Sequence, residues 1–129
     1  MDTFFELTII FLFGAIVYTC IEILWRGHTH LTMTLTGGVC FVFIYLLRIA
    51  VPDLNIFLRA LLSAAVISGI ELAVGCVVNL KLGLEVWNYS ELKFNFMGQV
   101  CVFYSFLWYL LSILSDILAG IFYELIFNI

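Results

Sequence analysis

The stretch AVISGIELAVGCVVN, residues Ala65–Asn79, places a glutamate, Glu71, near the middle of a long apolar run. Of the 129 residues in the chain, 65% are hydrophobic and 11% are charged, and the mean hydropathy is +1.21. Soluble domains carry about 25% charged residues, so a soluble chain of this size could not bury so much apolar surface. The composition therefore predicts an all-α integral membrane protein, built on apolar runs of roughly 18 residues or more.

The apolar runs predict four transmembrane helices within a single domain that covers residues 1–129. Pro52 ends the second run, because proline cannot continue helical hydrogen bonding. Asp116 interrupts the last run, so residues 117–127 are expected either to extend the fourth helix or to lie at the membrane interface. The connection Leu80–Phe96 is rich in aromatic and charged residues, which predicts an interfacial helix or a re-entrant loop between helices 3 and 4. The four expected helices cover about Thr3–Trp25, Thr34–Val51, Ile56–Asn79 and Met97–Ser115.

Several classes of function find no support in the sequence. The four cysteines lie in apolar segments without C-x-x-C spacing, which indicates buried thiols instead of disulfides or zinc ligands. His28 and His30 lie near Glu22 and could bind a metal, but their polar turn favours solvated histidines. The net charge of −4 provides no basic patch for nucleic acid. No nucleophile–base pair, phosphate loop or cofactor fingerprint is present, so neither an enzyme nor a cofactor is predicted.

Two similar segments indicate an internal duplication. VYTCIEI at residues 17–23 resembles VISGIEL at residues 66–72, and Leu31–Cys40 aligns with Leu92–Cys101. We expect two parallel helical-hairpin repeats, at about residues 3–51 and 55–127, related by a pseudo-two-fold axis along the membrane normal. Glu22 and Glu71 would then lie in the same leaflet and could approach each other. The alternative is chance similarity between two apolar segments.

The paired glutamates are the strongest functional signal, because an acid inside the bilayer needs a partner, a proton or a wet cavity. Glu71 could instead bond neighbouring side chains and hold the bundle together, and Glu22 could form a helical ion pair with Arg26. Trp87 and Tyr89 beside the acids could form a cage for an organic cation, or belong to an interfacial aromatic belt. The complete predicted binding site consists of Glu22, Glu71, Tyr18, Trp87, Tyr89, Asn95 and Gln99.

Gln99 is expected one turn inside the fourth helix, as a hydrogen-bond partner for Glu71 or for a ligand. Asp116 and Glu124 are expected at the membrane interface. These expectations place Gln99, Asp116 and Glu124 in neither a metal site nor a catalytic site.

Five blocks of the sequence resemble the ABC-transporter type IV family of small bacterial multi-pass membrane proteins, over roughly residues 10–112. The block from Val86 to Gln99 is the most specific, although Asn88 stands where the resemblance leads us to expect an aspartate. The blocks are Tyr18-Thr-Cys-Ile-Glu22, Trp25-Arg-Gly-His28, Ile70-Glu71-Leu72, Val86-Trp-Asn-Tyr-Ser90 and Phe94-Asn-Phe-Met-Gly-Gln99, and the pairs Gly37-Gly38 and Gly75 with Asn79 add to the resemblance. The resemblance implies a multi-pass protein of the bacterial cell membrane and, for an ABC permease, a separate ATPase subunit.

These observations together predict a small transporter or permease-like protein with an acidic, aromatic-rimmed site for a cation, a proton or a small organic cation. A bundle of four spans encloses little pathway, so a homodimer is expected. The alternative function is a non-transporting membrane binding or sensor module, or an accessory subunit of a larger membrane complex. A membrane enzyme that uses the paired acids is a weaker third possibility.

Overall fold

The computed structural model describes residues 3–127, and its main elements are helices. Four helices in this range are long and apolar enough to cross a membrane. This confirms the prediction of an all-helical membrane architecture. The helices are α1 (Thr3–Arg26), α2 (Leu31–Ala50), α3 (Ile56–Gly75) and α4 (Val102–Ile121).

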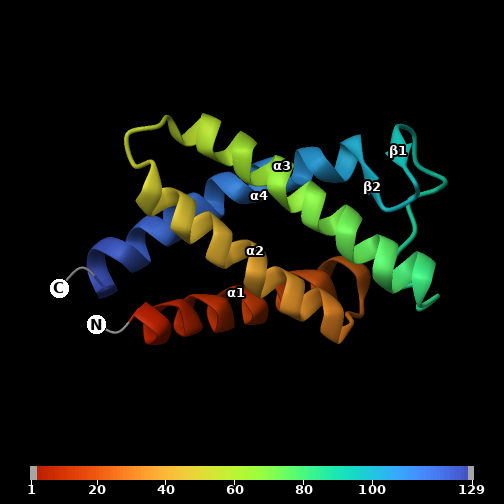
Figure 1. The fold of residues 1–129 in the computed structure, drawn as a ribbon, viewed down its shortest axis with the longest axis horizontal. Helices are drawn as coiled ribbons and strands as arrows, with labels where there is room; N and C mark the ends of the chain where they lie inside the picture. Colours follow the sequence, from red (N-terminus) through yellow and green to blue (C-terminus); the bar gives the residue numbers. More distant parts are fainter. Residues whose placement is uncertain (1–2, 128–129) are drawn as a thin grey trace.

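The four helices run alternately up and down, as Figure 1 shows. The start of α1, the turn between α2 and α3 and the end of α4 lie at one end of the bundle, which we call the terminal end. The connections after α1 and after α3 lie at the opposite end, the connection end. A core cluster of Ile10, Phe41, Ile44, Tyr45 and Ala119 joins α1, α2 and α4.

The ends of α2 and α3 follow from local chemistry. The side chain of His30 accepts a hydrogen bond from the Thr32 amide at 3.2 Å and caps the start of α2. Asn55 caps α3 in the same way, since its side-chain oxygen accepts from the Phe57 amide at 2.8 Å. The helix α2 ends at Ala50, two residues before Pro52, in agreement with the predicted break.

Glycines allow α1 and α2 to approach closely. A Cβ atom added to Gly37 would lie 2.6 Å from the Cβ of Tyr18, and one added to Gly38 would lie 2.6 Å from the ring of Phe11. A Cβ atom added to Gly14 of α1 would lie 2.4 Å from the Cβ of Phe41. Small residues at a helix interface favour packing in lipid because the two backbones can come together.

Both helices of the second half continue in π-helical turns. The helix α3 passes into η1 (Cys76–Lys81), and α4 passes into η2 (Phe122–Phe127). Of the two expectations for residues 117–127, the helical extension is therefore confirmed. The expected start of the fourth helix at Met97 is wrong, because α4 begins at Val102.

The connection between α3 and α4 is a compact loop with a short hairpin. Strand β1 (Asn95–Phe96) pairs antiparallel with β2 (Val100–Cys101), and the turn between them places Met97 and Gly98 at positive φ. The expectation of a short helix here is wrong, because residues 82–101 form turns and strands, although a re-entrant placement stays a prediction. Residues 92–101 also differ from the helical residues 31–40 with which they align, so that part of the predicted repeat has no common conformation.

Candidate functional site

A cavity of about 240 Å³ lies between the four helices. On α4 its lining residues extend from Trp108 to Leu118, and on α2 from Met33 to Ile44. These stretches correspond to about 15 Å along a helix axis at 1.5 Å per residue. The cavity is therefore elongated along the bundle, with Tyr18 and Glu71 among the residues that line it.

Glu71 provides the carboxylate of this cavity and is 4% exposed. Its Oε2 atom accepts a hydrogen bond from the Tyr89 hydroxyl at 2.9 Å, and its Oε1 atom accepts from Trp108 Nε1 at 3.2 Å. Both donors are neutral. Among the described residues, no arginine, lysine or histidine forms an ion pair with Glu71. The carboxylate is thus hydrogen-bonded but lacks a compensating positive charge from the described chain.

Aromatic rings surround the Glu71 carboxylate. The ring of Tyr18 lies 5.9 Å from that of Trp108, centroid to centroid, and both residues line the cavity. Tyr89 stacks on Tyr104 at 4.7 Å, with ring planes 9° apart. Burial and the neighbouring Glu71 raise the pKa of Tyr89 above its usual value, so its hydroxyl remains a neutral donor.

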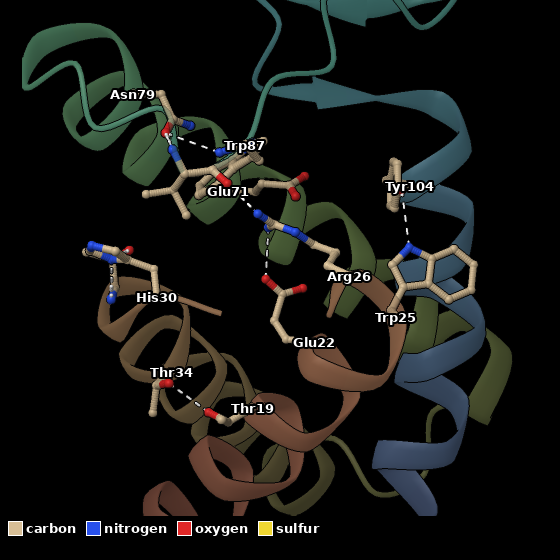
Figure 2. Close-up of polar contacts among 12 residues, drawn as sticks. Thr19, Glu22, Trp25, Arg26, His30, Thr34, Glu71, Asn79, Trp87 and Tyr104 are labelled. Atoms are coloured by element: carbon tan, nitrogen blue, oxygen red, sulfur yellow. Dashed lines mark hydrogen bonds and ion pairs between the residues drawn. The ribbon is translucent and has the colours of Figure 1, made fainter. Parts of the chain in front are cut away.

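Glu22 is buried near Glu71 but has a different environment. Arg26 Nη1 lies 2.9 Å from Glu22 Oε1, and Arg26 Nη2 donates to the backbone carbonyl of Val86 (Figure 2). Tyr18 lies within electrostatic reach of both glutamates, and the two glutamates also interact with each other. Glu22 therefore forms the helical ion pair that was the alternative to ligand binding, and it is not among the residues that line the cavity.

The other predicted site residues organise the connection between α3 and α4. Trp87 Nε1 donates to the Gln99 carbonyl at 2.9 Å, and Asn79 Nδ2 donates to Gln99 Oε1 at 2.7 Å. Asn95 Oδ1 accepts from the Gly98 amide at 3.0 Å inside the hairpin turn. Gln99 lies ahead of α4, so the expectation that it lies one turn inside the fourth helix is wrong. This network shapes the loop that carries Tyr89 to Glu71.

The two histidines of the predicted turn have no metal cluster around them. His30 caps α2 and is exposed. Figure 2 shows it at the start of this helix. Among the described residues, no group of three or more His, Cys, Asp or Glu side chains could hold a metal ion. The arrangement at Glu71 is therefore the principal candidate site.

A second buried ion pair lies toward the terminal end and was missed in the sequence. Asp116 is 3% exposed, and its two oxygens accept from Arg59 Nε and Nη2 at 2.8 and 2.9 Å. Asp116 is therefore buried inside the bundle, whereas the side chain of Glu124 is 64% exposed, and the expected depth of both residues at the membrane interface stays a prediction. The sequence does place opposite charges, Arg59 and Asp116, on two antiparallel helices, and this could have indicated the pair. Whether they meet depends on the rotation of each helix about its axis, which the sequence pattern does not specify.

Trp108 and Ser112 are the functional candidates that sequence reasoning overlooked on α4. They lie four residues apart, so both face the cavity from the same side of the helix. In the sequence they look like an ordinary part of an apolar run.

Comparison with known proteins places the chain in a family. No curated protein and no solved structure matches it. A family model described as "Putative ABC-transporter type IV" matches residues 9–128. That range covers nearly the whole chain and includes every element of the candidate site. The chain therefore belongs to this family of ABC-transporter-related membrane proteins.

Proposed function

We propose that the protein is the membrane-embedded part of a transporter and binds a small organic cation in the cavity beside Glu71. The observation that carries this proposal is the buried Glu71 carboxylate, which lines a largely apolar cavity and has only neutral hydrogen-bond donors. An ionised carboxylate in a low-dielectric interior is costly without a positive partner. A bound cation would supply that partner.

The lining of the cavity favours an organic cation over a metal ion. Metal cations such as Ca²⁺ and Mg²⁺ require six or more oxygen ligands, counting retained waters. Here one carboxylate is accompanied by hydroxyl groups and by many apolar side chains, including Phe13, Phe41 and Ile67. The aromatic faces of Tyr18 and Trp108 suit a cation that carries hydrocarbon, since cation–π contacts contribute about 2 kcal/mol when desolvated.

In this proposal Glu22 acts on the site from a distance. Its charge is paired with Arg26, and Arg26 also holds the loop through the carbonyl of Val86. The loop residues Trp87, Asn95 and Gln99 position Tyr89 above Glu71, so they form a rim at the connection end. Proton binding at Glu71 is the competing use of the same carboxylate.

The assembly around this site is also part of the proposal. We place the protein in the bacterial cell membrane as a homodimer of bundles, each built as two hairpin repeats, with a separate ATPase subunit to drive transport. The family supports a transport context. The dimer would enlarge the pathway that one short bundle can enclose.

The experiment is a binding assay on the purified protein in lipid nanodiscs, joined by an uptake assay in proteoliposomes that also contain the ATPase subunit. The probe is pentyltrimethylammonium, an elongated cation, with binding measured by calorimetry and uptake measured with a radiolabel. Glu71→Gln is expected to weaken binding about 10- to 100-fold, the equivalent of a lost charged contact of about 1.5–3 kcal/mol. The control is Glu91→Gln, which removes the same charge from an exposed loop position. Equal binding by the two variants would refute the assignment of Glu71.

One observation favours the non-transporting alternative, an accessory or sensor subunit. Both carboxylate oxygens of Glu71 already accept hydrogen bonds, as expected of a residue that ties α3 to α4 and to the loop. In that case Glu71→Gln would lower the melting temperature without any change in probe binding. Binding of the probe without uptake, in the presence of its ATPase partner, would indicate a sensor instead of a transporter.

A further inference from the structure

Ser112 is a buried polar residue with an unsatisfied hydroxyl. It is 1% exposed, and its Oγ atom has no hydrogen-bond partner among the described residues. A serine in the middle of a helix ordinarily bonds to the carbonyl one turn before it or points to solvent. Because a buried hydroxyl without a partner has lost its hydrogen bonds to water and gained none in return, it is unfavourable and calls for an explanation.

The position of this hydroxyl relates it to the proposed cation site. Ser112 lines the same cavity as Glu71. It follows Trp108 by four residues on α4, and Trp108 Nε1 contacts the Glu71 carboxylate at 3.2 Å. Four residues of helix correspond to about 6 Å along the axis. Ser112 therefore lies about one helical turn along α4 from the residue that contacts the carboxylate.

The lining between and around the two groups is mainly apolar. Phe13, Phe41 and Ile67 contribute hydrocarbon from three different helices, and Leu111 contributes from α4. An occupant that fits such a lining has an apolar body with polar groups at two defined points. The elongated shape of the cavity favours an extended molecule over a compact ion.

We propose that the cavity selects an extended amphiphilic cation whose positive group lies at Glu71 and whose hydroxyl or carbonyl group, about one helical turn away, hydrogen-bonds to Ser112. This inference rests on the proposed function and specifies its substrate class. The ligand satisfies both of the polar requirements that the protein leaves open: a positive partner for the carboxylate and a hydrogen-bond partner for the hydroxyl.

The test compares two probes that differ by one group. They are (5-hydroxypentyl)trimethylammonium and pentyltrimethylammonium, and calorimetry on the protein in nanodiscs measures their affinities. In the unaltered protein the hydroxylated probe is expected to bind about fivefold more tightly, the value of one net hydrogen bond. In Ser112→Ala this ratio is expected to fall to about one. In Glu71→Gln both probes are expected to weaken by the same factor.

A matched control uses another serine of α4. Ser105 already shares a hydrogen bond of 2.8 Å with Ser68 and does not line the cavity, so Ser105→Ala is expected to retain the fivefold ratio. Ser112→Ala removes an unpaired group, and we expect its melting temperature to be unchanged or slightly raised. A marked decrease in melting temperature would overturn the inference, because it would mean that the hydroxyl already has a partner in the protein, such as a buried water.

The outcomes distinguish this inference from the function on which it rests. If both probes bind through Glu71 but their ratio is the same in Ser112→Ala as in the unaltered protein, the role of Ser112 is refuted and the cation site stands. If neither probe shows binding that depends on Glu71, the proposed function itself is refuted, and the inference falls with it.

Discussion

Replacement of Arg59 by methionine should destabilise the bundle strongly, because it leaves Asp116 as a buried charge. Arg59 and Asp116 are 5% and 3% exposed, and two hydrogen bonds of 2.8 and 2.9 Å join them. Arg59 Nη1 also donates to the carbonyls of Val51, Pro52 and Leu54 in the turn before α3. Removal of one partner from a buried pair costs about 3–5 kcal/mol.

The assay is reversible unfolding of the purified protein by sodium dodecyl sulfate in mixed micelles, followed by circular dichroism. Arg48→Met is the matched control, since Arg48 Nε lies 3.8 Å from Asp116 and its side chain is 23% exposed. We expect this control to lose at most about 1 kcal/mol. The double variant Arg59→Met with Asp116→Leu should recover most of the loss, because it leaves no unpaired charge.

Two results would refute this reasoning. If Arg59→Met changed the free energy of unfolding by no more than Arg48→Met, the pair at Arg59 would have no special role. If the double variant were as unstable as Arg59→Met alone, the loss would arise from packing or from the turn carbonyls instead of from the buried Asp116 charge that has lost Arg59.

Three further predictions concern the packing of α1 on α2 and the loop between α3 and α4. Gly37→Ala should cost about 1–3 kcal/mol in the same unfolding assay, because the added Cβ would lie 2.6 Å from the Cβ of Tyr18. Gly98→Ala should cost about 1 kcal/mol, because Gly98 has φ +73 and an added Cβ would lie 3.1 Å from Asn88 Oδ1. Equal stability would contradict the turn geometry. Burial raises the pKa of Tyr89 in the folded protein above the unfolded tyrosine value of about 10. The folded protein therefore holds this proton more tightly than the unfolded chain does, so stability should fall as pH rises through about 10. Tyr89→Phe should show a shallower fall in melting temperature with rising pH, measured between about pH 8 and about pH 11. An identical slope in the variant and the unaltered protein would contradict this.

Much of the architecture could be predicted from local sequence. The helices α1 and α2 begin and end within about three residues of the expected positions, because apolar runs and Pro52 mark their bounds. The start of α4 was placed five residues too early, at Met97 instead of Val102. Residues 97–101 continue the apolar character of the helix, but Gly98 adopts φ +73 and directs the chain into a hairpin.

The candidate site was predictable only in part. Glu71 could be found because a carboxylate within an apolar run is conspicuous, whereas the expected approach of Glu22 to Glu71 stays a prediction. Trp108 and Ser112 could not be found, because indole and serine are common in membrane helices. Their relation to Glu71 depends on which face of α4 turns toward α3.

The sequence by itself determined that this protein is helical and crosses a membrane, because length and hydropathy are local properties that lipid imposes on each segment separately. It also determined that Glu71 would need a partner. Only the tertiary structure decided that Tyr89 and Trp108 contact Glu71, that Arg59 pairs with Asp116, and that an elongated cavity passes Ser112. The physical reason is that such contacts depend on the rotation, tilt and depth of one helix relative to another, and these follow from the packing of all four helices together.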